Sequence, residues 1–463
     1  MKKTITVAFV LLVAFSTAQS NISLPAIFGD HMVLQQNADI TIWGWAKPLE
    51  EITITASWDT GKQYTLKVEN QGVWSTVIET PSAGGPYKLT LKGHNTIEIN
   101  DILIGEVWLG SGQSNMEWTP HSKIDNGEEE RANANYPEIR FFTVFNSTAS
   151  VPQQLLTGEW VVCTPETMWN FSAIMYFFGR ELYQNLHVPV GLINSSWGGT
   201  PLEVWVPEPI IRVDRILSAD ADKLKPIPWG PHEPGKANNA MIHPLIPFKI
   251  KGVLWYQGEA NVGFPTHYAR ALSTLIHTWR AAWGDDFSFY YAQIAPYNGY
   301  GKDNVNGAIL RDQQRKVLGL TMKTGMVVLS DIGDLDNIHP GNKQEAGKRL
   351  ANWALNRDYG MSEKVVSGPL YHSYQIEKAS VILHFDYAED GLVAKNGELK
   401  EFEILNEEGN WIQAKASIKK NTVIVQQESV KLPKGVRFGY HNNSNPNLFN
   451  AAGLPASCFE ILF

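Results

Sequence analysis

Residues 102–116 read ILIGEVWLGSGQSNM, an apolar run that passes into a glycine-flanked turn. A run of aliphatic and aromatic residues that ends at glycine predicts a buried strand, and Ser114 would lie just beyond its carboxyl end. Similar runs occur at residues 190–193, 253–256, 289–294 and 326–329. Apolar residues at three- and four-residue spacing predict helices over 266–283 and 342–357. Strands that alternate with helices indicate an α/β fold, with a parallel sheet covered by helices on both faces.

The chain is too long for one ordinary core, because 463 residues usually divide into two or three domains. Short segments that alternate apolar and polar residues precede residue 101 and return after residue 360. We therefore expect an N-terminal β-sandwich over 21–100, a central α/β domain over 101–360 and a C-terminal β-rich domain over 361–463.

The first 20 residues have the composition of a secretory signal peptide. Lys2 and Lys3 precede an apolar stretch over residues 7–15, and small residues follow it. The stretch is too short for a membrane span, which needs about 17 or more apolar residues. No other segment is long and apolar enough, so we expect export to the periplasm or the extracellular medium without a membrane anchor.

Charge and cysteine content argue against several classes of partner and cofactor. Loss of the two signal-peptide lysines changes the formal net charge from -8 to -10, which disfavours binding to nucleic acid. Two cysteines are too few for a disulfide framework or a structural zinc site. Asp331, Asp334 and Asp336 do not fit a calcium loop, because Asp336 stands where the loop needs glycine. We expect no metal site.

Polar or glycine-rich segments follow four of the predicted strands. They are Ser114 and residues 194–199, 257–259 and 331–339. Because the carboxyl ends of parallel strands meet at one edge of an open sheet, these segments should form a single site. Tryptophans that flank these segments could line a sugar site, although core packing is the favoured interpretation for each of Trp118, Trp197 and Trp205.

These segments contain the groups needed for nucleophilic catalysis. A serine hydroxyl is a poor nucleophile unless a base takes its proton, and His339 could be that base for Ser114. Asp336 could hold the imidazole in the required tautomer. Candidate donors to the developing oxyanion are the backbone N–H of Ser114, that of Gly198 or Gly199, and the side-chain amide of Gln257.

Each segment also has a purely structural interpretation. Glycine-flanked serines are common in turns, Asp336 could cap a helix that begins near Gly341, and His339 could be an ordinary loop residue. Gln257 and Glu259 could likewise be polar loop residues. The functional interpretation depends on all four segments following strands of one domain.

A set of motifs occurs in order along most of the chain. They are GEVW through GQSNM at 105–116, GLIN through WGGT at 191–200, MIHPL at 241–245, WYQGEAN at 255–261, DNIHP at 336–340 and the tail at 447–457. The set resembles the sialate O-acetylesterase family of the SGNH hydrolase superfamily. The resemblance implies a flavodoxin-like three-layer α/β/α core and removal of acetyl groups from carbohydrate hydroxyls, without a metal or organic cofactor.

The resemblance also assigns roles. It implies that Ser114 is the nucleophile, His339 the base and Asp336 its acid partner. It places Gly198 or Gly199 and Gln257 near the oxyanion. The superfamily usually has an asparagine where this chain has Gln257, so this donor is the least secure part, and Glu259 is an alternative acid partner for His339.

We therefore expect an exported serine carbohydrate esterase that acts on O-acetylated sialic acids through an acetyl-enzyme intermediate. The nearest alternative substrate is acetylated plant polysaccharide such as xylan. An alternative of another class is a non-catalytic glycan-binding protein, which the intact set of Ser114, Asp336 and His339 disfavours. The expected partner is an O-acetylated carbohydrate, with neither nucleic acid nor membrane, and the sequence leaves the oligomeric state open.

Overall fold

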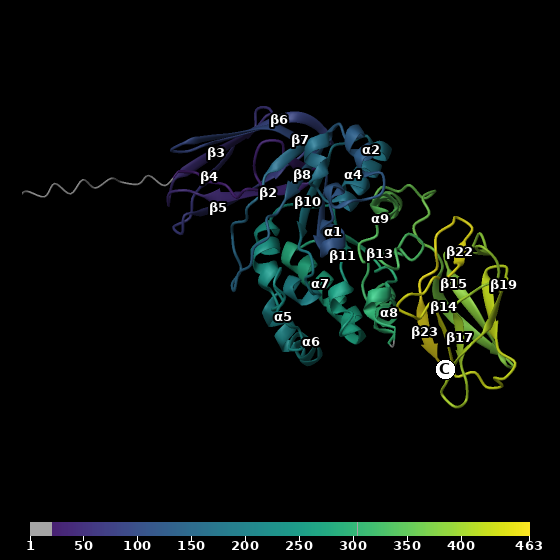
Figure 1. The fold of residues 1–463 in the computed structure, drawn as a ribbon. Coiled ribbons are helices and arrows are strands. Elements are labelled where there is room, and N and C mark those ends of the chain that lie inside the picture. Colours follow the sequence, from purple (N-terminus) through teal and green to yellow (C-terminus); the bar gives the residue numbers. More distant parts are fainter. Residues whose placement is uncertain (1–20, 303) are drawn as a thin grey trace, which may run out of the picture.

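The computed structural model describes residues 21–302 and 304–463, and the predicted signal peptide over 1–20 lies outside the described residues. Figure 1 shows a central sheet with helices on both faces, and strands gathered into further β-rich regions toward each end of the chain. The predicted fold class, α/β with a parallel sheet and flanking β-rich regions, is confirmed.

The central sheet contains β7 (Thr96–Gly112), β8 (Tyr136–Thr143), β9 (Trp160–Cys163), β10 (Val190–Ser196), β11 (Gly252–Tyr256), β12 (Ser288–Ala292) and β13 (Thr324–Val327). Their order is β13-β12-β11-β7-β10-β8-β9, and neighbours are parallel except for β8 and β9. When β7, β10, β11, β12 and β13 are numbered along the chain, their spatial order is 2-1-3-4-5, as in flavodoxin-like sheets. In such sheets, ligands bind at the carboxyl edge of the strands.

The long helices cover both faces of this sheet. Helices α4 (Ala173–Leu186) and α9 (Lys343–Arg357) pack on one face, and α7 (Tyr268–Trp283) and α8 (Asn306–Val317) pack on the other. Successive side chains of a strand point to opposite faces, so Tyr290 of β12 stacks on Trp353 of α9 while Phe289 contacts Trp279 of α7. The strands are buried on both faces for this reason.

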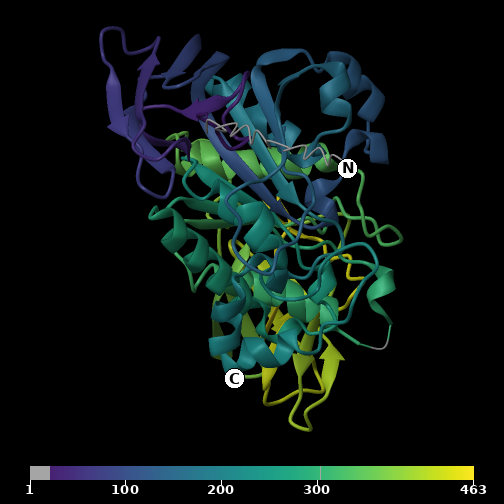
Figure 2. The ribbon, with the colours of Figure 1, turned by 90° about the vertical axis from the view of Figure 1, so that its left-hand side faces the viewer.

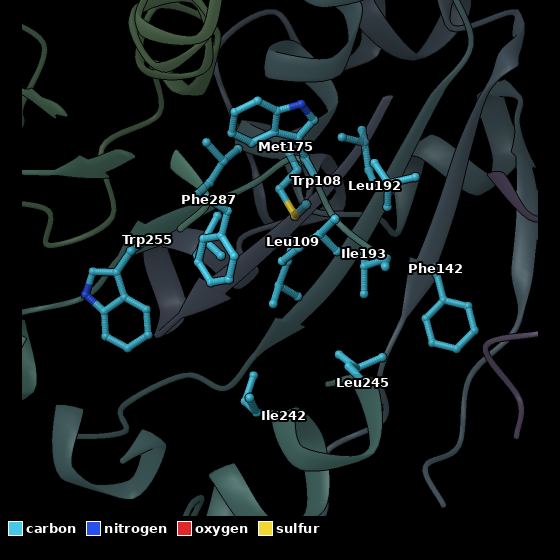
Figure 3. Packing of buried hydrophobic residues seen from close by; sticks show 14 of the residues in the cluster. Trp108, Leu109, Phe142, Met175, Leu192, Ile193, Ile242, Leu245, Trp255 and Phe287 are labelled. Carbon is cyan, nitrogen blue, oxygen red and sulfur yellow. The ribbon is translucent and has the colours of Figure 1, made fainter. Parts of the chain in front are cut away.

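Figure 3 shows the same alternation around the two central strands. Trp108 and Leu192 lie on the side of Met175, which belongs to α4, whereas Leu109 and Ile193 lie toward the opposite side. All of these side chains are at most 1% exposed. This packing holds the ends of β7 and β10 next to each other at the carboxyl edge of the sheet.

The N-terminal strands form two groups, and only one of them joins the central sheet. The paired strands β2 and β5 form one sheet, and β1, β3, β4 and β6 associate with the first half of β7. Their bounds are β1 Val33–Gln35, β2 Asp39–Trp45, β3 Glu51–Ala56, β4 Tyr64–Lys67, β5 Val73–Glu79 and β6 Gly84–Lys92. Because β7 continues into the central sheet, the predicted boundary at residue 100 lies inside one continuous strand.

The C-terminal strands enclose an apolar core of their own, which includes Val381, Phe402 and Phe459. Figures 1 and 2 both show this region at the end of the molecule opposite the N-terminal strands. The bounds are β14 Leu370–Glu377, β15 Ser380–Asp386, β16 Leu392–Ala394, β17 Phe402–Leu405, β18 Trp411–Gln413, β19 Lys415–Lys419, β20 Thr422–Gln426, β21 Gly435–Phe438, β22 Leu448–Asn450 and β23 Phe459–Leu462.

The remaining helices are short, with bounds α1 Ser114–Glu117, α2 Gly127–Asn133, α3 Pro165–Trp169, α5 Glu208–Val213 and α6 Arg215–Ala221. Cys163 and Cys458 are both buried free thiols. Within 21–302 and 304–463, no helix has both the length and the apolar character needed to cross a bilayer.

Candidate active site

Ser114 is the first residue of α1, and only Gln113 separates it from the end of β7. The turn between them needs glycine at position 112, where φ is +133° and a Cβ atom would lie 2.2 Å from the carbonyl oxygen of Tyr256. The chain can therefore pass close to β11 as it turns. The structure thus places Ser114 at the carboxyl edge of the sheet.

His339 reaches Ser114 from the loop between β13 and α9. Its Nε2 atom lies 2.9 Å from Ser114 Oγ, although the two residues are 225 positions apart in sequence. The indole of Trp118 stacks on the imidazole, with ring centroids 3.9 Å apart and an angle of 15° between the planes. This stacking fixes the plane of the imidazole and keeps Nε2 directed at the hydroxyl.

The surroundings of His339 favour its neutral form. Burial lowers the pKa of His339 to about 4, and the positive charge of Lys343 acts in the same direction. Burial also lowers the pKa of Lys343 to about 7, so Lys343 is still charged over the range in which His339 titrates. At neutral pH the imidazole can therefore accept the proton of Ser114.

Asp336 lies on the same loop as His339, but its carboxylate points elsewhere. Its Oδ1 atom accepts a hydrogen bond of 2.8 Å from Asn298 Nδ2, and the residue is exposed. Its backbone N–H donates to Asp334 Oδ1 at 2.9 Å within a tight turn. Among the described residues no hydrogen bond joins Asp336 to His339, so the structure brings Ser114 and His339 together without the expected third member.

Glu259, the alternative acid, lines the same cavity as Ser114 and His339. Its Oε1 atom accepts from Asn115 Nδ2 at 2.5 Å, and its Oε2 atom is buried without a hydrogen-bond partner in the described chain. Burial raises the pKa of Glu259, while the nearby charge of Lys343 opposes this effect. No hydrogen bond from Glu259 to His339 is present within the described residues either.

Asn115 is not a predicted site residue, yet its side chain connects the two catalytic loops. Its Nδ2 atom also donates to the carbonyl oxygen of Ile338 at 3.0 Å, and its Oδ1 atom accepts from the buried Lys343 Nζ at 2.6 Å. Asn115 follows Ser114 directly, and Ile338 directly precedes His339. One buried amide therefore fixes the spacing between the nucleophile and its base.

Gln257 is fully buried, and its amide is not positioned to donate to an oxyanion. Its Nε2 atom donates to Gln113 Oε1 at 3.1 Å, to the Thr200 carbonyl at 3.1 Å and to Asn261 Oδ1 at 2.8 Å. These acceptors account for both amide hydrogens. Gln257 thus holds three neighbouring loops together, and the donation expected from the sequence is not seen in this arrangement.

The glycines after β10 lie beside Ser114, and one of their N–H groups is already used. Gly198 donates its backbone N–H to Glu117 Oε2 at 2.7 Å, whereas the N–H of Gly199 has no acceptor within residues 21–302 and 304–463. Glu117 also accepts a longer bond of 3.4 Å from Asn146 Nδ2. The Gly198 N–H becomes available to a substrate oxygen only when the Glu117 carboxylate moves away.

A cavity of about 640 Å³ opens over these groups. Its charged and aromatic lining consists of the carboxylates of Glu117 and Glu259 and the indoles of Trp197 and Trp229, besides His339, and includes no lysine or arginine of the described chain. Trp205, in contrast, is fully buried in the core. Within 21–302 and 304–463, no group of three or more His, Cys, Asp or Glu side chains is arranged to hold a metal ion.

Several known proteins are similar to this chain in sequence. A family model described as a carbohydrate esterase, sialic acid-specific acetylesterase, matches residues 104–356. Human sialate O-acetylesterase is 32% identical over 414 residues, which cover 81% of this chain and 78% of the human protein. The rat sialate O-acetylesterase is 30% identical over 441 residues, which cover 81% of this chain and 80% of the rat protein.

A solved structure extends the likeness to nearly the whole chain. The crystal structure of a carbohydrate acetylesterase from Xanthomonas citri matches with a TM-score of 0.87 and 34% identity, covering 95% of this chain and 99% of that one. The resemblance inferred from the motifs is therefore confirmed. The chain belongs to the sialic acid-specific acetylesterase family of carbohydrate esterases and is a carboxylic ester hydrolase.

Proposed function

We propose that the protein is an exported serine esterase that removes O-acetyl groups from sialic acids, with Ser114, His339 and Asp336 as its triad. The observation that carries the proposal is the 2.9 Å contact between Ser114 Oγ and His339 Nε2 beside a cavity of about 640 Å³. Membership of the acetylesterase family supports the acetyl ester as the group removed. The composition of residues 1–20 supports export.

The reaction would proceed in two halves. Ser114 Oγ attacks the acetyl carbonyl carbon while His339 Nε2 takes the hydroxyl proton, and the bond from this carbon to the sugar oxygen then breaks. His339 returns the proton to that oxygen, which releases the sugar and leaves an acetyl-enzyme. Water then attacks the acetyl group, again giving its proton to His339, and acetate leaves as Ser114 regains its proton.

Backbone N–H groups would stabilise the oxyanion. The N–H of Ser114 lies at the first position of α1, where no helical acceptor exists, and the N–H of Gly199 is also unused in the described chain. Gly198 would join them once Glu117 moves. Gln257 would contribute indirectly by holding Gln113 in place beside the nucleophile.

The pH dependence of the free enzyme should reflect the lowered pKa of His339. We expect kcat/KM for a small aryl acetate to rise with pH through about 4 and to be level above about 5. The sign follows because only neutral imidazole accepts the serine proton, and its pKa lies below the ordinary value of about 6.5. Initial rates between about pH 3 and pH 8 would measure this limb.

The Lys343→Met variant provides the matched comparison. It removes the positive charge that disfavours the imidazolium form of His339. The pH at which kcat/KM rises should therefore move toward neutral. If kcat/KM of the wild-type enzyme instead rises with an apparent pKa at or above about 6.5, the expectation is contradicted. His339 would then be paired with a carboxylate before substrate binds.

One observation favours a second candidate, a neutral acetylated polysaccharide such as xylan. The cavity contains the carboxylates of Glu117 and Glu259 and no lysine or arginine of the described chain. Sialic acid has a carboxylate of its own, and like charges placed together in a partly desolvated site oppose binding. A neutral acetylated sugar avoids this repulsion.

Acetate release from O-acetylated sialic acid and from acetylated xylan would separate the two candidates. We expect the wild-type enzyme to release acetate from the sialic acid, and Glu117→Gln to change that rate more than the rate on xylan, because only the first substrate is anionic. A kcat/KM at least about tenfold higher on xylan would favour the second candidate. Release from neither substrate, with normal cleavage of an aryl acetate, would contradict both.

A further inference from the structure

A second hollow adjoins the catalytic cavity. It has a volume of about 510 Å³ and shares Trp197 and Trp229 with the cavity over Ser114. We name it the outer hollow, and its further lining includes Ser150, His232 and Lys236. Both volumes lie within the range of roughly 300–1,000 Å³ that is typical of ligand sites. A ligand longer than one sugar residue could therefore extend from the first hollow into the second.

Trp229 stands at the junction of the two hollows and is 62% exposed. Single exposed apolar residues are common, so exposure alone means little, but this indole also packs against the site. A Cβ atom at Gly199 would lie 2.1 Å from Trp229 Nε1, which shows how closely the ring packs on the loop after β10. The Trp229 carbonyl also accepts the Trp197 indole N–H at 2.7 Å. The backbone of Trp229 is thus bonded to Trp197, and its exposed ring lies against Gly199 beside Ser114.

The polar groups of the outer hollow are largely balanced in charge. Lys236 Nζ donates to Ser150 Oγ at 3.0 Å and pairs with Glu233 Oε2 at 3.3 Å. His232 adds a further hydrogen-bonding group to the same lining. An aromatic plane bordered by neutral and paired polar groups suits a sugar ring, whose C–H face packs on an indole while its hydroxyls bond at the edge.

We propose that the outer hollow is a second glycan subsite, in which the sugar residue next to the acetylated one stacks on Trp229 while the ester lies at Ser114. This inference rests on the proposed function as a carbohydrate esterase. Its consequence is a preference for acetyl groups on oligosaccharides over the same groups on single sugars. The preference does not depend on whether the acetylated residue is a sialic acid or a neutral sugar.

Paired substrates test the subsite. Values of kcat/KM are compared for acetylated xylo-oligosaccharides and an acetylated methyl xyloside, and for O-acetylated sialyllactose and free O-acetylated sialic acid. The wild-type enzyme should prefer the longer member of at least one pair. Trp229→Ala should lower kcat/KM on that longer member by about tenfold, mainly through KM, and lower it less on the short member and on an aryl acetate. Trp229→Tyr should restore most of the loss.

Phe264→Ala is the control, because Phe264 is also a surface aromatic, 36% exposed, and lines neither hollow. It should leave the preference for longer substrates intact. Equal losses on long and short substrates in Trp229→Ala would overturn the subsite, since the ring would then act only within the catalytic cavity. Absence of any preference in the wild-type enzyme would overturn it as well.

Failure of the proposed function is distinguishable from failure of the subsite. If no carbohydrate releases acetate while an aryl acetate is cleaved, the proposed function fails. Calorimetric titration with unacetylated xylotriose and sialyllactose then decides the subsite without catalysis. Binding to the wild-type protein that is lost in Trp229→Ala and kept in Phe264→Ala supports it, whereas no binding, or equal binding to both variants, overturns it.

Discussion

Replacing Ser114 by alanine is expected to lower kcat for a small aryl acetate by about 10⁴-fold or more, and His339→Ala should cause a loss of the same order. Without the hydroxyl no acetyl-enzyme forms, and without the imidazole the hydroxyl keeps its proton. The two groups act as one unit across the 2.9 Å contact, so the double variant should be little slower than either single variant. Steady-state rates with each purified variant would measure these losses.

Ser111→Ala is a matched control for the loss of a hydroxyl near the same turn. Ser111 lies in β7, and its Oγ atom is buried without a hydrogen-bond partner in the described chain, so its removal breaks no bond. This variant should keep near-normal turnover and a wild-type melting temperature. Near-normal turnover in Ser114→Ala would instead show that another nucleophile carries the reaction, and near-normal turnover in His339→Ala would show that another group is the base.

The approach of Ser114 to His339 could be predicted from sequence because it depends mainly on strand order. Each residue follows a strand of one parallel sheet, and the carboxyl ends of such strands share an edge. Apolar runs identify the strands, and the polar residues that follow them identify the loops. No side-chain detail is needed to place the two residues on the same edge.

The direction of individual polar side chains could not be predicted in this way. Gln257 follows the predicted strand, but its amide is directed by acceptors on Gln113 and Thr200, which belong to other segments. Asp336 follows β13, but within the described chain its carboxylate accepts a hydrogen bond from Asn298 and not from His339. Motif spacing fixes where a residue leaves the sheet, whereas hydrogen-bond competition among neighbouring loops decides which way the side chain points.

The fold shows a similar division. The predicted helices over 266–283 and 342–357 correspond to α7 and α9, since both have one apolar face. Helix α4 was not predicted, because its first half, residues 173–178, is apolar and buried on every side and has no polar face to reveal a helical period. A run of this kind has the same pattern as a buried strand.

Asp336→Asn is expected to lower kcat by about 10³–10⁴-fold if Asp336 orients His339 as proposed, because an amide favours the wrong imidazole tautomer. In the structure Asp336 Oδ1 bonds to Asn298, so the carboxylate must turn toward His339 when substrate binds. Asn298→Ala frees the carboxylate and should leave kcat within a few-fold of wild type. Glu259→Gln should lower kcat less than Asp336→Asn does, because a glutamine oxygen can still accept the hydrogen bond from Asn115.

The pH profiles of the same variants distinguish the two acids by a property that a folding defect does not change. An acid that pairs with His339 only in the complex should raise the acid limb of kcat above that of kcat/KM, because the first reports bound enzyme and the second free enzyme. Asp336→Asn should remove this separation, whereas Glu259→Gln should preserve it. If Glu259→Gln removes the separation and causes the larger loss of kcat, Glu259 is the orienting acid. The Oε2 atom of Glu259, buried and without a hydrogen-bond partner among the described residues, would then be the group that turns to His339.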